Sequence, residues 1–122
     1  MKFMAMISAS EVNGAFPPLP PALMQAIMQF GEEAMKAGVL VEQGGLLPSS
    51  TGARIRLSKD GEITTHDGPF TESKEIVGGF AVYEVPTREE GMKWIRRFVE
   101  LHKIHWPGWE GTCEVRQMMN QG

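Results

Sequence analysis

The chain has 122 residues, and its 12 Lys and Arg against 15 Asp and Glu give a formal net charge of −3 at pH 7. Hydrophobic residues make up 42% and charged residues 22%, which is typical of a globular protein, so residues 1–122 are predicted to form a single domain. Only Arg96 and Arg97 among the basic residues are adjacent. We therefore expect no nucleic-acid partner, because nucleic acids are bound by clustered Lys and Arg.

Cysteine usage and the N-terminal segment bear on location. Cys113 is the single cysteine, so no internal disulfide can form. The chain opens with Lys2 and a short apolar run, as a signal peptide would, but Ser8, Ser10 and Glu11 interrupt that run. No apolar stretch is long enough to span a membrane. We expect a cytoplasmic protein with no membrane partner.

The first two predicted elements are a strand over residues 2–8 and a helix over residues 21–36. KFMAMIS is a nearly continuous apolar run, which favours a strand covered on both faces. A loop rich in proline precedes the helix. The helix repeats apolar residues at spacings typical of one buried face, namely Leu23, Ile27, Phe30 and Ala34. Three methionines, Met24, Met28 and Met35, are expected to widen that buried face.

A second strand over residues 39–48 and a hairpin follow. Gly44 and Gly45 interrupt the strand, which indicates a bulge or a close backbone approach. ARIRLS then alternates, so Ile55 and Leu57 are expected to face inward. Asp60-Gly61 predicts a two-residue turn that leads into the returning strand EITTH. One face of this hairpin is polar, which indicates a flap added to the core.

The last elements complete an α+β pattern. IVGGFAVYEV, residues 76–85, has small or apolar residues on both alternating faces. Thr87 and Glu90 form a capping box before a helix that ends near Pro107, and TCEVRQMM predicts a final strand. Two β-α-β units in one sheet predict a ferredoxin-like βαββαβ fold with an inserted β-hairpin and both helices on one face. We expect a homodimer through the helix-free sheet face, because that face is largely apolar.

The segment DGPFTESKEIVGGF, residues 67–80, follows GVLVEQGGLLP and precedes CEVRQMM. Together these stretches resemble the DGPF-domain branch of the YCII-related protein family, over almost the whole chain. The resemblance implies a dimeric α/β barrel. Some family members carry a histidine on the first helix and an aspartate that line a cleft, but this first helix has no histidine. That general base is therefore not carried over. Many DGPF-type proteins are thought to be encoded beside alternative sigma factors.

Asp67 has two interpretations. An aspartate that opens Asp-Gly-Pro can accept hydrogen bonds from backbone N–H groups just after it and so form a turn. Alternatively, Asp67 is a catalytic proton acceptor at the rim of a cleft. His66 is adjacent on a strand, so its side chain is expected to point to the other side and to form no dyad with Asp67. Phe70 is expected to be largely buried and to anchor the loop.

The other candidate ligand-binding residues also keep a structural alternative. Glu72 and Glu75 form either a solvated turn with Lys74 or a carboxylate pair with a raised pKa. His102 and His105 are spaced to hold a metal, but the dipole at a helix C-terminus accounts for them as well. Trp106, with Trp109, either lines an aromatic ligand pocket or pins a Pro-Gly turn.

Two hypotheses about function follow. The first is a small-molecule-binding domain or a small acid–base enzyme acting on a polar organic substrate in a cleft near the DGPF loop. The second is a non-catalytic dimeric accessory or sensor module, linked by the resemblance to transcriptional regulation. We expect no metal and no organic cofactor, because the chain has one cysteine, no H-x-x-x-H pair and no phosphate-binding loop before a helix.

Overall fold

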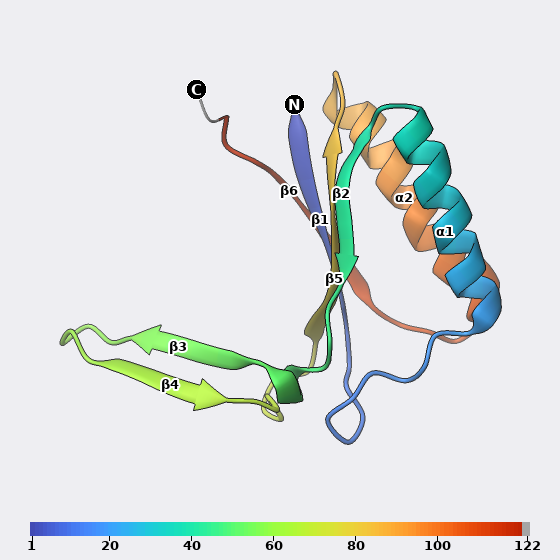
Figure 1. The fold of residues 1–122 in the computed structure, drawn as a ribbon. Helices are drawn as coiled ribbons and strands as arrows, with labels where there is room; N and C mark the ends of the chain where they lie inside the picture. The colour runs from blue at the N-terminus through green and yellow to red at the C-terminus, as the bar shows by residue number, and fades with distance from the viewer. Residues whose placement is uncertain (121–122) are drawn as a thin grey trace.

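The computed structural model describes residues 1–120 and contains two helices, a main sheet and a separate hairpin (Figure 1). In chain order the elements are β1 (Lys2–Ala9), α1 (Pro21–Lys36), β2 (Leu40–Gly45), the short 3-10 helix η1 (Ser49–Thr51), β3 (Ala53–Leu57), β4 (Ile63–Asp67), β5 (Ile76–Glu84), α2 (Arg88–His105) and β6 (Thr112–Gln117). The predicted α+β class and the order of its elements are confirmed. Neither helix in residues 1–120 is both long and apolar enough to cross a membrane.

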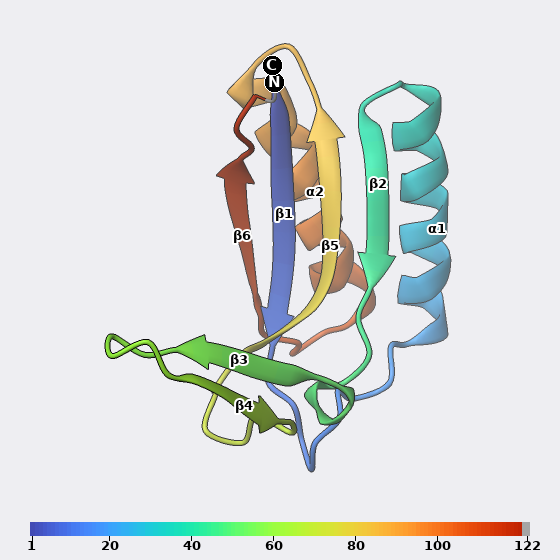
Figure 2. The same cartoon turned by 60° about the vertical axis from the view of Figure 1, so that its left-hand side comes forward.

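The main sheet has four antiparallel strands in the order β2-β5-β1-β6. Both helices cover the same face of this sheet, and the opposite face has no helix (Figure 2). This arrangement is compatible with the predicted ferredoxin-like fold. The strands described in this single chain do not close into a barrel, because β2 and β6 are the two edges of the sheet.

The core lies between the helices and the sheet. β1 and β5 pair so that Phe3 is opposite Tyr83 and Ala5 is opposite Ala81, and alternate side chains of both strands point toward the helices. Phe30 from α1 and Ile95 from α2 pack against them. Beside this core, α1 and α2 are joined by an ion pair. The guanidinium of Arg97 donates hydrogen bonds of 2.6 and 2.9 Å to the two carboxylate oxygens of Glu33.

Local signals set the helix ends. Pro21 begins α1, where the missing N–H group costs nothing, and Gly38 follows its end with φ of +74°. At the start of α2 the hydroxyl of Thr87 accepts a hydrogen bond of 3.2 Å from the backbone N–H of Glu90, which confirms the predicted N-cap.

The expectation that the α1 methionines widen its buried face is wrong. Met24, Met28 and Met35 are 51%, 61% and 62% exposed, whereas Leu23 is fully buried. The helix meets the sheet and α2 along one stripe only, and these three side chains lie beside that stripe.

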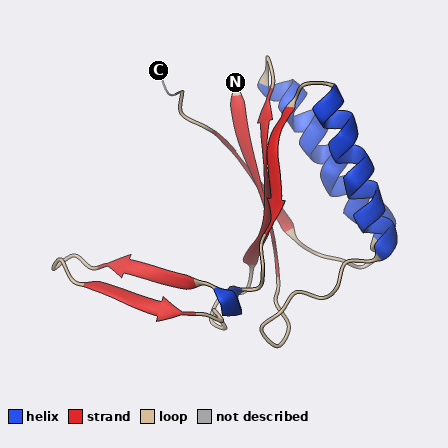
Figure 3. Cartoon of the chain, viewed as in Figure 1, coloured by secondary structure: helices blue, strands red, loops and turns tan. Residues whose placement is uncertain are grey.

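Strands β3 and β4 form a two-stranded sheet of their own, which we call the arm (residues 53–67). It projects from the base of the main sheet on the side away from the helices (Figure 3). Every strand residue of the arm is exposed, so the expectation that Ile55 and Leu57 face inward is wrong. The turn also differs from the predicted one. The backbone of Ser58 bonds to Glu62, which leaves the three residues 59–61 as the loop, with Gly61 at φ of +90°.

The helix-free face of the main sheet, which we call the open face, has an apolar centre. Met4 is paired with Val82 and Met6 with Phe80, and all four side chains point away from the helices. Charged residues surround them on the same face, namely Lys2, Glu42, Glu84, Glu114 and Arg116. Gly44 is the predicted close approach, because a Cβ there would lie 3.0 Å from the ring of Phe80. The bulge in β2 lies earlier, between Leu40 and Glu42.

Candidate functional site

A cavity of about 700 Å³ lies between the helix-covered face of the sheet and the two helices. Its volume falls within the range of roughly 300–1,000 Å³ that is usual for ligand pockets. Strands β1, β2 and β5 line one side, α1 and α2 the other, and the loop after β1 contributes Phe16 to Leu19. No Asp, Glu, Lys or Arg is among the lining residues.

Small residues on the sheet create this space. Ala5 is opposite Ala81 in the pairing of β1 with β5, and Gly79 is opposite Ile7. These positions face the helices, where larger side chains would fill the gap. On the other side α2 presents Ile95, Phe98 and His102 at spacings of three and four, which place them on one helix face.

His102 is the most buried titratable residue in the cavity wall apart from Tyr83, with 6% of its surface exposed. Its Nδ1 lies 3.1 Å from the carbonyl oxygen of Phe98. Since a carbonyl only accepts, Nδ1 carries the proton and Nε2 keeps a free lone pair. Burial lowers the pKa of His102, and the hydrogen bond to Phe98 opposes part of that shift. The imidazole is therefore neutral at pH 7 and offers an acceptor.

Aromatic rings surround this imidazole. Its centroid lies 4.7 Å from that of Trp109 and 5.0 Å from that of Phe98. Trp106 stacks on Trp109 with 6.1 Å between ring centroids, and both tryptophans line the cavity. Trp109 approaches the chain closely at Gly111, where a Cβ would lie 2.2 Å from the indole. The two tryptophans thus both pin the turn and form a wall of the cavity.

Tyr83 is the second buried polar group, with 2% of its surface exposed. Burial, aided by the neighbouring Cys113, raises the pKa of Tyr83 to about 12, so its hydroxyl stays protonated. Among residues 1–120 every fully buried side-chain nitrogen or oxygen has a hydrogen-bond partner. No hydrogen bond to the Tyr83 hydroxyl or to the Nε2 of His102 is found within this part of the chain, so both atoms must keep some accessible surface, and both residues line the cavity.

Cys113 also lines the cavity. Burial raises the pKa of its thiol, which is therefore protonated at neutral pH. A protonated thiol is a poor nucleophile, and the half-buried position of Cys113 in β6 is typical of a cysteine that packs as a small hydrophobic residue.

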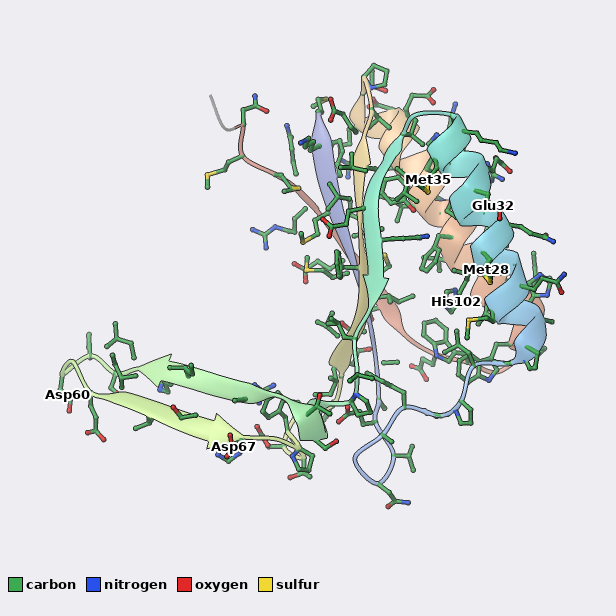
Figure 4. The ribbon with its side chains drawn as sticks, viewed as in Figure 1. Met28, Glu32, Met35, Asp60, Asp67 and His102 are labelled. Atoms are coloured by element: carbon green, nitrogen blue, oxygen red, sulfur yellow. The ribbon has the colours of Figure 1, made fainter. Side chains whose placement is uncertain are left out.

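The structure brings together only part of the predicted site. His102 and Trp106 line the cavity, while His105 is partly buried but is not part of the wall. Asp67 lies on the arm, well away from His102 (Figure 4), and its neighbour His66 is exposed there too. Within residues 1–120 no three His, Cys, Asp or Glu residues are grouped so that they could hold a metal.

The expected hydrogen-bonded turn at Asp67 does not form. Asp67 is the last residue of β4 and pairs with Ala53 across the arm. The N–H of Gly68 donates to the carbonyl of Gly52 at 2.9 Å, and Pro69 has no N–H. No donor therefore remains for the Asp67 carboxylate at the positions that such a turn uses, and the side chain is exposed.

The DGPF loop is instead held by contacts from η1 and the arm. Phe70 is partly buried, and the guanidinium carbon of Arg54 lies 3.9 Å from its ring centroid. Arg54 also donates a 2.5 Å hydrogen bond to Glu72, so that carboxylate is paired and not free for acid–base chemistry. Gly68 sits so close to η1 that a Cβ would lie 1.7 Å from the carbonyl oxygen of Ser49.

Glu75 lies in a different place from Glu72. It lines a second, more open hollow of about 540 Å³ with Ser10, Lys74 and Glu110. Its carboxylate accepts a 3.1 Å hydrogen bond from the hydroxyl of Thr112. The two glutamates therefore form no carboxylate pair.

Two important groups escaped the sequence analysis. The sequence pattern predicts Tyr83 only as part of an apolar strand, although the alternation of that strand indicates that it shares a face with Ala81. Glu11 and Ser49 form a part-buried link, in which the Ser49 hydroxyl and N–H donate to the two carboxylate oxygens of Glu11 at 2.5 and 2.6 Å. They are separated by 38 residues, and no local pattern in the sequence connects them.

The fold and the cavity define a small α+β domain with a largely apolar site between its sheet and its helices. The chain belongs to the YCII-related domain family, whose sequence profile matches residues 1–101. That match ends directly before His102, so His102, Trp106 and Trp109 lie outside the matched residues. Comparison with curated proteins gave no match.

Proposed function

We propose that this protein binds an uncharged, largely apolar small molecule in the cavity between its sheet and its helices. The observation that carries this proposal is the composition of the wall, which has no charged residue around about 700 Å³ of space. A charged ligand would lose its hydration there without gaining a counter-charge, and that loss costs several kcal/mol in a protein interior. Apolar and aromatic side chains supply most of the contact surface for a neutral one.

The proposed site is the cavity and not the DGPF loop. Asp67, His66 and Glu72 are exposed and lie outside the cavity wall, whereas His102 offers a neutral base inside it. The ligand is accordingly apolar and not a polar organic acid or amine. Asp67 remains a candidate only for chemistry outside this cavity.

Binding without chemistry is favoured over an acid–base enzyme by the state of the cavity groups. Burial keeps the thiol of Cys113 and the hydroxyl of Tyr83 protonated, so neither is an activated nucleophile. His102 is then the single basic group in the wall, and no acid faces it there. This favours a sensor or accessory module, and membership in the DGPF branch, which residues 67–70 support, would place it near transcriptional regulation.

A homodimer through the open face is the second part of the proposal. Met4, Met6 and Phe80 are half-buried on a sheet face that no helix covers, and Val82 on the same face is 6% exposed. A sheet-to-sheet dimer would cover it and complete the α/β barrel that the family resemblance implies. Such an interface would bury on the order of 1,200 Å² or more in total, the usual lower limit for a specific interface.

Isothermal titration calorimetry with matched bicyclic probes tests the binding proposal. 2-Methoxynaphthalene is neutral, whereas 2-naphthoate and 2-naphthylmethylammonium add a negative and a positive charge to the same ring system. We expect the neutral probe to bind at least tenfold tighter than either charged probe. Ala81→Leu, which places a larger side chain in the cavity, should weaken that binding while circular dichroism confirms an intact fold. Equal binding of charged and neutral probes would contradict the proposal.

A further inference from the structure

We propose that the ligand of this cavity is an aryl alcohol whose hydroxyl donates a hydrogen bond to Nε2 of His102. This inference rests on the proposed function and names the class of molecule that the site takes. Among the polar side chains of the wall, His102 is the acceptor that lies in a buried residue, whereas Gln43 is exposed and Ser8 is half-buried. Because Nδ1 donates to the carbonyl of Phe98, Nε2 is fixed as an acceptor, and His102 is part of the cavity wall.

The need for a donor follows from burial. His102 is 94% buried, since 6% of its surface is exposed, and an apolar ligand that displaced water from Nε2 would leave that nitrogen unpaired. An unsatisfied buried acceptor is unfavourable, so a ligand with a donor at this point binds better than one without. The donor is a hydroxyl and not an ammonium group, because no carboxylate lines the cavity to balance a positive charge.

The aromatic character follows from what surrounds His102. Trp109 lies 4.7 Å and Phe98 5.0 Å from the imidazole, centroid to centroid, and Trp106 stacks on Trp109. A ligand whose hydroxyl reaches Nε2 must place its carbon skeleton among these rings. Flat aromatic groups pack well there in offset or edge-to-face contacts. A phenol-type hydroxyl is also more acidic than an aliphatic one and so makes the stronger hydrogen bond to an imidazole nitrogen.

The decisive experiment compares 2-naphthol with 2-methoxynaphthalene, which differ by the methyl group that removes the donor. Calorimetry at pH 7.5 on the full chain should show 2-naphthol binding roughly 2- to 13-fold tighter, which is the effect of one hydrogen bond. In His102→Phe, which keeps an aromatic ring but no acceptor, the two affinities should become equal. Equal affinities in the unaltered protein would overturn this inference and leave the proposed function standing. Failure of both probes to bind would overturn both.

A pH series on the unaltered protein gives an independent readout in case His102→Phe does not fold. Protonation of His102 turns Nε2 into a donor, so the preference for 2-naphthol should disappear as the pH falls. The midpoint of that loss should equal the midpoint of the His102 ring titration measured by NMR. Tyr83 on β5 and Cys113 on β6 are the other titratable groups that face the cavity, and both stay neutral at acid and neutral pH because burial raises each pKa. The lining residues of α1, β1 and β2 carry no titratable side chain. A preference that stays constant while the ring titrates would overturn the inference.

Discussion

Replacing Ser49 with alanine should weaken the attachment of the DGPF loop and the arm to the rest of the domain. The Ser49 side chain is 5% exposed and holds three segments together. It donates to the carboxylate of Glu11 at 2.5 Å and accepts from the backbone N–H of Phe70 at 3.0 Å. The first bond is charge-assisted and worth roughly 1.5–3 kcal/mol, and the second is worth about 1 kcal/mol. We therefore expect Ser49→Ala to lower the free energy of unfolding by about 2–4 kcal/mol.

Urea denaturation followed by circular dichroism measures this change, and Ser50→Ala is the matched control. Ser50 is adjacent but exposed, so its removal should alter the free energy of unfolding by less than about 0.5 kcal/mol. Hydrogen exchange of the β3 and β4 amides should also accelerate in Ser49→Ala. If Ser49→Ala and Ser50→Ala proved equally stable, the link between Glu11, Ser49 and Phe70 would not be what holds this loop.

Three further predictions concern the open face, Asp67 and His102. Met6→Lys should convert a dimer into a monomer in light scattering, because it buries a charge at the centre of the open face; an unchanged mass would argue against this interface. Asp67→Asn should change the free energy of unfolding by less than about 0.5 kcal/mol and leave the affinity for 2-methoxynaphthalene unchanged, because Asp67 is exposed and lies outside the cavity wall. A clear loss of affinity would show that Asp67 takes part in binding. Burial holds the pKa of His102 below its ordinary 6.5, so between those two values the unfolded chain binds more protons than the folded one. Stability should accordingly fall as the pH drops from 6.5 toward the folded pKa, and urea midpoints at pH 7 and 5.5 should differ less in His102→Phe than in the unaltered protein.

Much of the fold was predictable because its signals are local. The helix predicted over residues 21–36 is α1, and every predicted strand is present with ends that differ by at most three residues. Apolar spacing, the proline at the start of α1 and the cap at Thr87 each act within a few residues. The ferredoxin-like order then followed from chain connectivity.

The failed expectations concern which faces are covered. Alternation correctly places Ile55 and Leu57 on one side of the arm, but both are exposed because no second layer lies against it. The same reason exposes Met28 and Met35 on α1. A local sequence pattern shows which side chains share a face. Whether that face is buried depends on where the other helices and strands pack, which is a property of the whole domain.

The site was predictable only in part for a similar reason. His102 and Trp106 were identified as candidates from residue type, and both line the cavity. The cavity itself arises because Ala5, Gly79 and Ala81 are small at positions that face the helices. Free volume depends on how residues from different strands and helices pack, and no motif in the sequence marks it.

The most motif-like stretch of the chain and the proposed ligand site therefore have different physical roles. In the DGPF loop, Gly68 is required by the close approach to Ser49, Phe70 packs under Arg54, and Glu72 is paired with Arg54. These contacts fix the loop in place, and its remaining carboxylate, that of Asp67, is exposed to solvent and lies outside the cavity wall. At the cavity, Tyr83 and His102 are 2% and 6% exposed, and no protein group bonds to the Tyr83 hydroxyl or to the Nε2 of His102, which keep accessible surface. Accessible polar atoms in largely buried residues are groups that a ligand can pair with, so the proposed ligand site lies at helix α2 and strand β5 and not at the loop.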